Sequence, residues 1–220
     1  TAWNLAANWT AAAIPLTSAN IIFDDAPSND LYLDANRTVT NITNGTAYKL
    51  VTNGKQLTIK GSLNFTSGAQ IDASSSSSSI IYSGTSSQQI DGADFLNEKA
   101  YNVVIDNTPG VTVESNFVVD NALTINLGKK LVISAGTQLT VSGTLTNSAG
   151  NSGLVIRSTS NGNDGRLVNN TAAVPATVKL FISGGMGISG PAFHYVTPPV
   201  TSMSIDNSSV TACRTSLGLT

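Results

Sequence analysis

Apolar and polar residues alternate over short stretches along most of the chain. The clearest alternating stretches contain Leu57 and Ile59, Leu63 and Phe65, Tyr101 with Val103 and Ile105, Val111 and Val113, Phe117 and Val119, Leu123 and Ile125, Leu131 and Ile133, and Leu139 and Val141. A period of two residues is typical of a β-strand that buries one face. Nothing comparable has a helical period, and only DFLNEKA (94–100) tolerates a helical turn or two. The pattern therefore predicts an all-β chain.

Turn-forming segments such as TNG, NLG, SAG and NTPG separate these stretches, which recur every six to eight residues. Gly and Asn accept the positive φ angles that tight turns require. Two architectures fit this spacing. A sandwich would join antiparallel strands by hairpins, whereas a solenoid would turn corners and stack each coil in parallel on the last.

A repeated phrase favours the solenoid. GKQLTIKGSLNFTSG (54–68) returns as GTQLTVSGTLTNSAG (136–150), with both flanking glycines and the central Gly, Gln, Thr and Leu positions kept. Two similar phrases imply two equivalent places, which stacked coils provide and a sandwich does not. We therefore expect a right-handed parallel β-helix with coils of roughly twenty residues.

The phrase also predicts where its side chains lie. The residues expected to point into the coil are Leu57, Ile59 and Leu63 in the first copy and Leu139, Val141 and Leu145 in the second. Gly61 and Gly143 are expected at bends where no side chain fits. Thr58 and Thr140 are expected to face outward.

Composition along the chain suggests three regions. Residues 1–30 hold both tryptophans, Trp3 and Trp9, and are expected to form the first strands and an N-terminal cap that covers the open end of the coil. Residues 31–157 form the solenoid coils, and the serine run at 74–79 is expected to be a flexible loop. Residues 158–220 start with the polar STSNGNDG and form a linker plus a C-terminal β cap, or the start of a truncated second module.

The low charge of the chain limits the kinds of partner that it is expected to bind. Charged residues make up 11% of the chain and the formal net charge is −2, without a basic run, so nucleic acid is not an expected partner. No apolar run is long enough for membrane insertion, and TAWNLAANWT has neither the basic start nor the apolar stretch of a signal peptide. A surface rich in Ser, Thr and Asn with few charges is typical of an extracellular protein.

Several segments resemble a known family. The opening Trp, NW and ANIIFDDAPSNDLYLD resemble bacterial surface-exposed β-solenoids related to autotransporter repeats. GSLNF, YNVVIDNTPGVTV, NALTI, KLVISAGTQLTVSGTL and GLVIRS look like the coils of secreted adhesin-like proteins of the Bacteroidota, many exported by type IX secretion, and ATVKLFISGG with FHYVTPPV is similar to the stretch that follows such coils. The resemblance covers nearly the whole chain. It implies an extracellular, multi-module parent protein and carries no catalytic residues to transfer.

Acidic residues supply the alternative of an enzyme. Parallel β-helices also host polysaccharide lyases and hydrolases, whose sites need paired carboxylates and often Ca²⁺. The two acidic groups are Asp24, Asp25, Asp30 and Asp34 near the expected cap, and Asp91, Asp94 and Glu98 around the helix-tolerant patch. Either could bind Ca²⁺ weakly, but neither has the spacing of a known calcium loop. A solvated polar edge is favoured, and we expect no metal site.

Other catalytic sets are incomplete. His194 is the only histidine and Cys213 the only cysteine, which is too few ligands for zinc and leaves no nucleophile with a base. The Gly-rich SGGMGISG lacks the lysine and the strand-to-helix context of a phosphate loop, and we interpret it as a turn. We expect no catalytic residues and no cofactor.

Binding and structure remain as functions. Tyr32, Tyr48 and Tyr82 are candidate exposed platforms for sugars but are scattered, so a stalk ranks above glycan binding. The threonines expected to face outward suggest ice binding as a third hypothesis. Irregular coil lengths disfavour the flat, regular ladder of threonines that ice binding requires. These threonines are Thr38, Thr40, Thr58 and Thr140.

The sequence thus predicts a non-catalytic, extracellular structural or adhesion module of a bacterial surface protein. Its expected partners are glycans or host surface proteins and the rest of a larger parent polypeptide, though the ligand-binding residues are unknown. The alternative is a polysaccharide-binding or polysaccharide-degrading β-helix protein.

Overall fold

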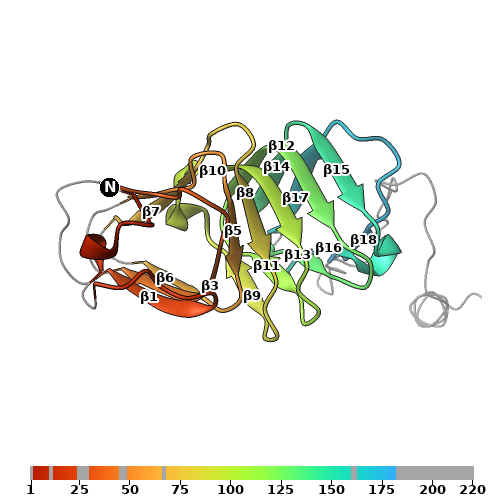
Figure 1. Cartoon of the computed structure of the whole chain (residues 1–220). Coiled ribbons are helices and arrows are strands. Elements are labelled where there is room, and N and C mark those ends of the chain that lie inside the picture. Colours follow the sequence, from red (N-terminus) through yellow and green to blue (C-terminus); the bar gives the residue numbers. More distant parts are fainter. Residues whose placement is uncertain are drawn as a thin grey trace, which may run out of the picture. The chain divides into compact units, whose positions relative to one another are not determined.

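A computed structural model describes residues 2–9, 12–23, 30–44, 49–65, 68–159 and 163–181 of the chain. The chain divides into two compact units, Thr1–Ile182 and Ser183–Thr220, and the second lies outside the described residues. The first unit is a parallel β-solenoid of about seven turns (Figure 1). Every paired strand in the described part is parallel to its neighbours, and the Ser158–Asp164 bridge is antiparallel. The predicted all-β solenoid is confirmed.

Each coil contributes strands to three faces. The first face contains β2 (Leu31–Tyr32), β4 (Lys49–Val51), β7 (Gln70–Ala73), the starts of β10 (Phe95–Ile105) and β12 (Phe117–Ile125), β14 (Gln138–Val141) and β17 (Arg166–Asn169). The second contains the start of β3 (Arg37–Asn44), β5 (Gln56–Ile59), β8 (Ser79–Tyr82), the ends of β10 and β12, and β15 (Thr144–Asn147). β1 (Ala19–Phe23) stacks on β3 at the N-terminal end.

The third face is interrupted. Its first part contains the ends of β1 and β3 with β6 (Leu63–Phe65), and its second part contains β9 (Gln88–Ile90), β11 (Val111–Val113), β13 (Leu131–Ile133), β16 (Leu154–Ile156) and β18 (Thr177–Val178). β6 does not pair with β9, so the two parts are separate sheets along this face, as Figure 1 shows. Short 3-10 turns lie at η1 (Ala6–Asn8), η2 (Gly92–Asp94) and η3 (Gly150–Ser152).

The core is one continuous column of inward side chains. Alternation in each strand places apolar residues inside, and stacking of the coils puts like positions in contact. The inward residues predicted from the repeat are buried as expected: Leu57, Ile59, Leu139, Val141 and Leu145 are at most 2% exposed, and Leu63 is partly buried against the core. Partners in neighbouring coils are 19 residues apart at Leu31 and Leu50, close to the predicted repeat.

The two copies of the repeated phrase lie on different faces. The first copy forms β5 and β6, which lie on the second and third faces, whereas the second copy forms β14 and β15, which lie on the first and second. Both copies build the same short corner between two strands. The expectation that the two copies occupy equivalent places in the coil is therefore wrong for the face on which each copy lies. It is right for the local structure, because both copies form the same corner.

The short corner moves because coil shape changes along the solenoid. In the early coils the chain passes from the second to the third face within β3 or through residues 60–62. In the later coils it passes from the first to the second face within β10 and β12, or through residues 142–143. The coil of β7, β8 and β9 lies between the two arrangements and has long corners at 74–78 and 83–87.

The N-terminal segment packs against the first coil through its two tryptophans. Trp3 is 1% exposed and packs edge-on against Trp9, with ring centroids 4.9 Å apart. The Trp9 Nε1 group donates to the Trp3 carbonyl oxygen at 2.9 Å, and the Arg37 guanidinium lies 5.7 Å from the centre of the Trp3 ring. The bridge from Ala2 to Tyr32 adds one more rung to the first face.

The expectation of a flexible serine loop was wrong, and the helix-tolerant patch is a strand. The serine run is a tight turn rather than a loose loop, because Ser78 is fully buried and its hydroxyl accepts from Thr52 Oγ1 at 2.7 Å and from the Gly54 N–H at 3.0 Å. The DFLNEKA segment is mostly strand β10, which bends at Asn97 and Glu98, both with positive φ. Pairing of β10 with three other strands outweighs its weak helical preference.

Candidate functional site: a cleft between the two parts of the third face

A cleft of about 720 Å³ opens where the third face is interrupted. Its lining includes one margin from β6 and the corner before it, and another from β9 and the corner at 83–87. The lining residues are Thr40, Asn41, Lys60, Gly61, Ser62, Leu63, Asn64, Phe65, Tyr82, Thr85, Ser86, Ser87, Gln88, Gln89, Asp91, Asp94 and Thr112. Its volume is in the range of small-ligand sites in proteins.

Corner length explains the opening. Three residues, 60–62, connect β5 to β6, whereas five residues, 83–87, connect β8 to β9. β5 and β8 are paired neighbours, yet the longer corner carries β9 away from β6. Glycines hold both corners close to the adjacent coil: a Cβ on Gly61 would collide with Asn41 and the Thr40 carbonyl, and one on Gly84 would lie 2.5 Å from the Lys60 carbonyl oxygen. The cleft is therefore built into the backbone path.

Both margins of the cleft are sheet edges. Among the described residues, β6 pairs only with β3 and β9 only with β11. Successive residues of a strand direct their N–H and C=O groups to opposite sides. Since the Ile42 N–H donates to the Ser62 carbonyl and the Gln88 N–H to the Gly110 carbonyl, the backbone groups of Leu63, Phe65 and Gln89 face the cleft.

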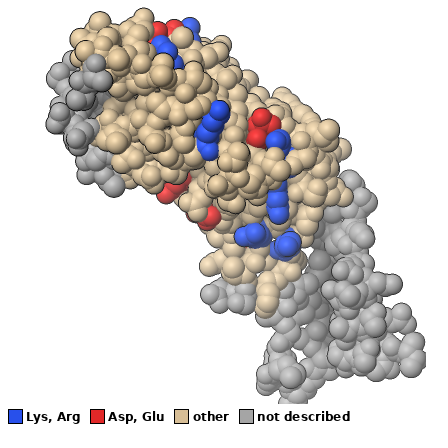
Figure 2. All heavy atoms as spheres, turned by 60° about the horizontal axis from the view of Figure 1, so that its bottom comes forward, with Lys and Arg blue, Asp and Glu red and all other residues tan. Residues whose placement is uncertain are grey.

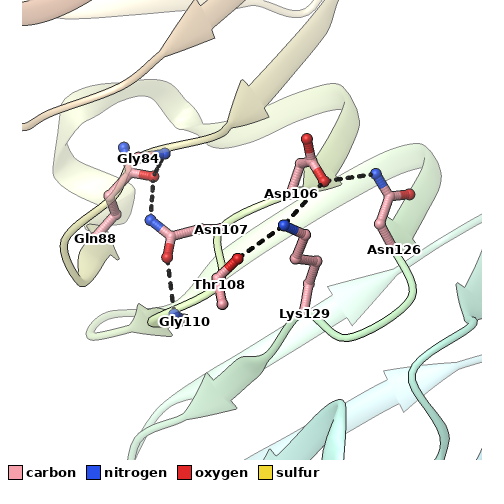
Figure 3. A network of polar contacts seen from close by, with 8 residues as sticks. All are labelled: Gly84, Gln88, Asp106, Asn107, Thr108, Gly110, Asn126 and Lys129. Atoms are coloured by element: carbon pink, nitrogen blue, oxygen red, sulfur yellow. Dashed lines mark hydrogen bonds and ion pairs between the residues drawn. The ribbon is translucent and has the colours of Figure 1, made fainter.

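Gln88 replaces the missing backbone pairing at one end. Its side chain is buried and its Nε2 donates to the carbonyls of Ile59 at 2.9 Å and Gly61 at 2.7 Å. Its Oε1 accepts from the Gly84 N–H at 2.9 Å and from Asn107 Nδ2 at 2.7 Å (Figure 3). One amide thus joins the corners of three successive coils and closes this end of the cleft.

The same row of polar corners continues into the next coils. Asn107 Oδ1 accepts from the Gly110 N–H at 2.8 Å. Figure 3 shows Lys129 reaching back between Asp106, at 3.6 Å, and the Thr108 hydroxyl, at 2.9 Å. These contacts stabilise the corners of β9, β11 and β13 and therefore fix one margin of the cleft.

An acidic pair lies at the cleft on the side of η2. The Asp91 carboxylate accepts from the Ala93 N–H at 3.0 Å and from the Ser115 hydroxyl at 2.8 Å. Burial, and secondly the nearby charge of Asp91, raises the pKa of Asp94 to about 7. Asp94 is therefore divided between its protonated and ionised forms at neutral pH.

Tyr82 supplies a polar group without a partner. It is 1% exposed, and its hydroxyl has no hydrogen-bond partner although it lines the cleft. Burial, and secondly the charge of Asp94, raises the pKa of this phenol, so it stays protonated. A buried hydroxyl without a partner costs free energy that a bound group could recover.

The structure brings some of the acidic residues predicted from the sequence to the cleft and places others elsewhere. Of the acidic residues, Asp91 and Asp94 line the cleft, while the exposed Glu98 is absent from its lining. Asp34 forms an ion pair of 2.7 Å with Arg37, whose hydrogen bond lowers the pKa of Asp34. Asp30 lies in the described part near β2, and Asp24 and Asp25 lie outside the described residues. Within those residues, no group of three or more His, Cys, Asp or Glu could hold a metal ion.

The tyrosine and threonine candidates also differ in whether the structure places them as expected. Tyr32 is 42% exposed, as expected, but the expectation that Tyr82 is exposed was wrong because it alternates with Ile80 into the core. Thr38 and Thr58 are partners in neighbouring strands, and the ladder then continues with Ile81, so the row of threonines is interrupted. Thr40 turns to the Ser18 carbonyl, and Thr140 lies between Val118 and Val168. Tyr48, His194 and Cys213 lie outside the described residues.

Sequence reasoning missed Gln88, Asn107 and the open strand edges. The available signal was GTSSQQI (84–90), where five polar residues separate two strands that a short corner joins in the previous coil.

Comparison of the chain with models of protein families, with curated proteins and with solved structures gave no match. In the part of the chain that the structure describes, no helix is long and apolar enough to cross a membrane.

Proposed function

We propose that this chain is a non-catalytic structural and adhesion module of a larger bacterial protein that is secreted or displayed on the cell surface. The module holds its partners at a distance and offers the cleft as an interaction surface. The resemblance of its coils to adhesin-like proteins of the Bacteroidota, many exported by type IX secretion, supports the extracellular location.

The observation that carries the proposal is a continuous core with a polar cleft on one side. The column of inward residues from Trp3 to Leu154 makes a stiff scaffold, because each coil packs on its neighbours. The surrounding surface has few charges, and Figure 2 shows for one face how scattered the Lys, Arg, Asp and Glu side chains are. Such a surface suits recognition by hydrogen bonds more than by electrostatic steering.

Binding to immobilised glycans and matrix proteins tests this function. We expect saturable retention of the chain on at least one surface, and weaker retention when the cleft is filled by Asn64→Trp. Thr124→Trp, on the outward side of the second face, is the matched control because it adds the same ring away from the cleft. Equal retention of both variants, or no retention on any surface, would contradict a role of the cleft in adhesion.

Asp94 supports a second candidate function, cleavage of a polysaccharide. A carboxyl with a pKa of about 7 can donate a proton at neutral pH, and the carboxyl group of Asp91 also lines the cleft. Reducing ends or unsaturated products from a polysaccharide panel, lost in Asp94→Asn and kept in Glu98→Gln, would establish this activity. We expect neither product, since the module is proposed to bind without catalysis.

A further inference from the structure

We propose that the cleft binds an extended peptide segment of a partner protein, which inserts as a strand between β6 and β9 and carries a basic side chain toward Asp91 and Asp94. This rests on the proposed adhesion function and names the class of its partner. Peptides commonly bind proteins by adding a strand to an exposed sheet edge.

The first support is the pair of strand edges. Leu63 and Phe65 on β6 and Gln89 on β9 direct backbone N–H and C=O groups into the cleft. No partner for these groups lies within the described residues. Because β6 and β9 belong to parallel sheets of one solenoid, their edges run in the same direction, and one inserted strand can pair with both.

The second support is the alternation of side chains along both margins. Asn64 and Gln89 point outward, whereas Ile90 points inward and Leu63 packs against the core. An inserted strand would place its outward residues between the amides of Asn64 and Gln89. Its inward residues would complete the wall of the coil and lie over the Tyr82 hydroxyl, which has no partner in the described structure.

The charged residues that line the cleft indicate which peptide side chain it favours. Asp91 and Asp94 are the acidic residues of the lining, and the Lys60 side chain lies on the opposite margin, at the corner before β6. A lysine at an inward position of the inserted strand would lie on the side of the half-buried Asp94, whose charge acts on Tyr82, and would favour the ionised form of Asp94. A neutral glycan could use the amides and hydroxyls but would leave the row of strand N–H groups only partly paired.

The probe is the peptide acetyl-Val-Thr-Lys-Thr-Val-amide, titrated into the ¹⁵N-labelled chain and followed by nuclear magnetic resonance. We expect saturable shifts of the Leu63, Phe65 and Gln89 amides, with a Kd below about 1 mM. Methylation of the backbone nitrogens of both threonines removes donors and should weaken binding at least about tenfold. Replacing the peptide lysine by glutamate should weaken it by a similar factor.

Two variants of one residue separate the backbone from the side chain. Gln89→Pro removes the N–H that faces the cleft, and proline is tolerated at an edge strand whose N–H faces away from the sheet. Gln89→Ala keeps that N–H. We expect the proline variant to lose peptide binding at least about tenfold and the alanine variant to lose less than about threefold, with circular dichroism showing both folded. If the proline variant does not fold, the methylated peptide provides the same comparison.

Other outcomes overturn the inference. Equal binding of the methylated and unmethylated peptides would exclude strand insertion, as would shifts confined to residues outside the cleft. Binding of a neutral oligosaccharide at the same amides, without binding of the peptide, would leave the adhesion function standing and replace its ligand. Retention on surfaces that is unaffected by Asn64→Trp would instead contradict the proposed role of the cleft.

Discussion

The two copies of the repeated phrase make the same contacts in different surroundings. In the first copy the Gln56 N–H donates to Asn36 Oδ1, and in the second the Gln138 N–H donates to Asn116 Oδ1, both at 2.9 Å. The Gln side chain then donates to the threonine two residues later in each copy. The flanking glycines have positive φ in both. The phrase therefore specifies a corner between two strands and leaves the choice of face to the rest of the coil.

That difference explains where the cleft forms. Before β8 the short corner joins the second and third faces, and after it the first and second. The coil between these arrangements has two long corners, and one of them moves β9 away from β6. A local motif used in two positions thus requires one irregular coil between them, and that coil supplies the polar opening.

Truncation of the central leucine in each copy should have the largest effect. Leu57 and Leu139 are at most 1% exposed, so Leu57→Ala and Leu139→Ala should each lower the free energy of unfolding by about 3 kcal/mol. Leu127, which is 80% exposed, provides the control, and Leu127→Ala should change it by less than about 0.5 kcal/mol. Urea unfolding followed by circular dichroism measures all three. A difference of more than about 2 kcal/mol between the two copies would show that their cores are not comparable.

Replacing the central glycine of each copy, Gly61 or Gly143, with alanine should destabilise the fold to different extents. A Cβ on Gly143 would lie 1.9 Å from the backbone carbonyl oxygen of Asn121, whereas one on Gly61 would lie 2.1 Å from the Asn41 side chain and 2.7 Å from the Thr40 carbonyl oxygen, so its backbone collision is the milder one. We expect Gly143→Ala to cost about 2.5 kcal/mol and Gly61→Ala about 1.5 kcal/mol. Ser142→Ala, at an exposed neighbouring position, is the control. Thermal unfolding in which Gly61→Ala is the more damaging change would reverse this account of the corners.

The sequence was sufficient for the fold because alternation and repetition both act locally. Leu57 and Ile59 alternate with polar residues, and the glycine at 61 marks a corner whatever lies on the neighbouring coil. The burial of Tyr82 follows from the same rule, since it is two residues from the buried Ile80.

The cleft could not be predicted in the same way. It depends on two corner lengths in one coil and on the absence of pairing between β6 and β9, which are more than twenty residues apart in sequence. Serine-rich corners such as 74–79 look flexible in sequence, yet Ser78 is fixed by contacts with Thr52 and Gly54 of the previous coil. Contacts of this kind arise only from stacking.

The asparagines that support each copy should contribute a smaller and equal amount. Asn36 and Asn116 are exposed, so water can replace their carbonyl oxygens, and Asn36→Ala and Asn116→Ala should each cost about 1 kcal/mol. Aspartate keeps the acceptor, so Asn36→Asp and Asn116→Asp should cost less. Hydrogen exchange at the Gln56 and Gln138 amides reports the same bond directly. Faster exchange in only one alanine variant would show that the two corners differ.

The effect expected at Asp94, in the irregular coil between the copies, depends on pH. Its pKa of about 7 lies above the unfolded value near 3.8, so the folded chain binds more protons between these values and loses stability as pH rises through this window. Asp94→Asn removes the ionisation, and its stability relative to the natural chain should be unchanged below pH 4, increase up to about pH 7 and then stay constant. Melting temperatures of the natural chain and of Asp94→Asn across this range measure the effect, and a flat difference would mean that opening the third face leaves this carboxyl as well solvated as one at the surface.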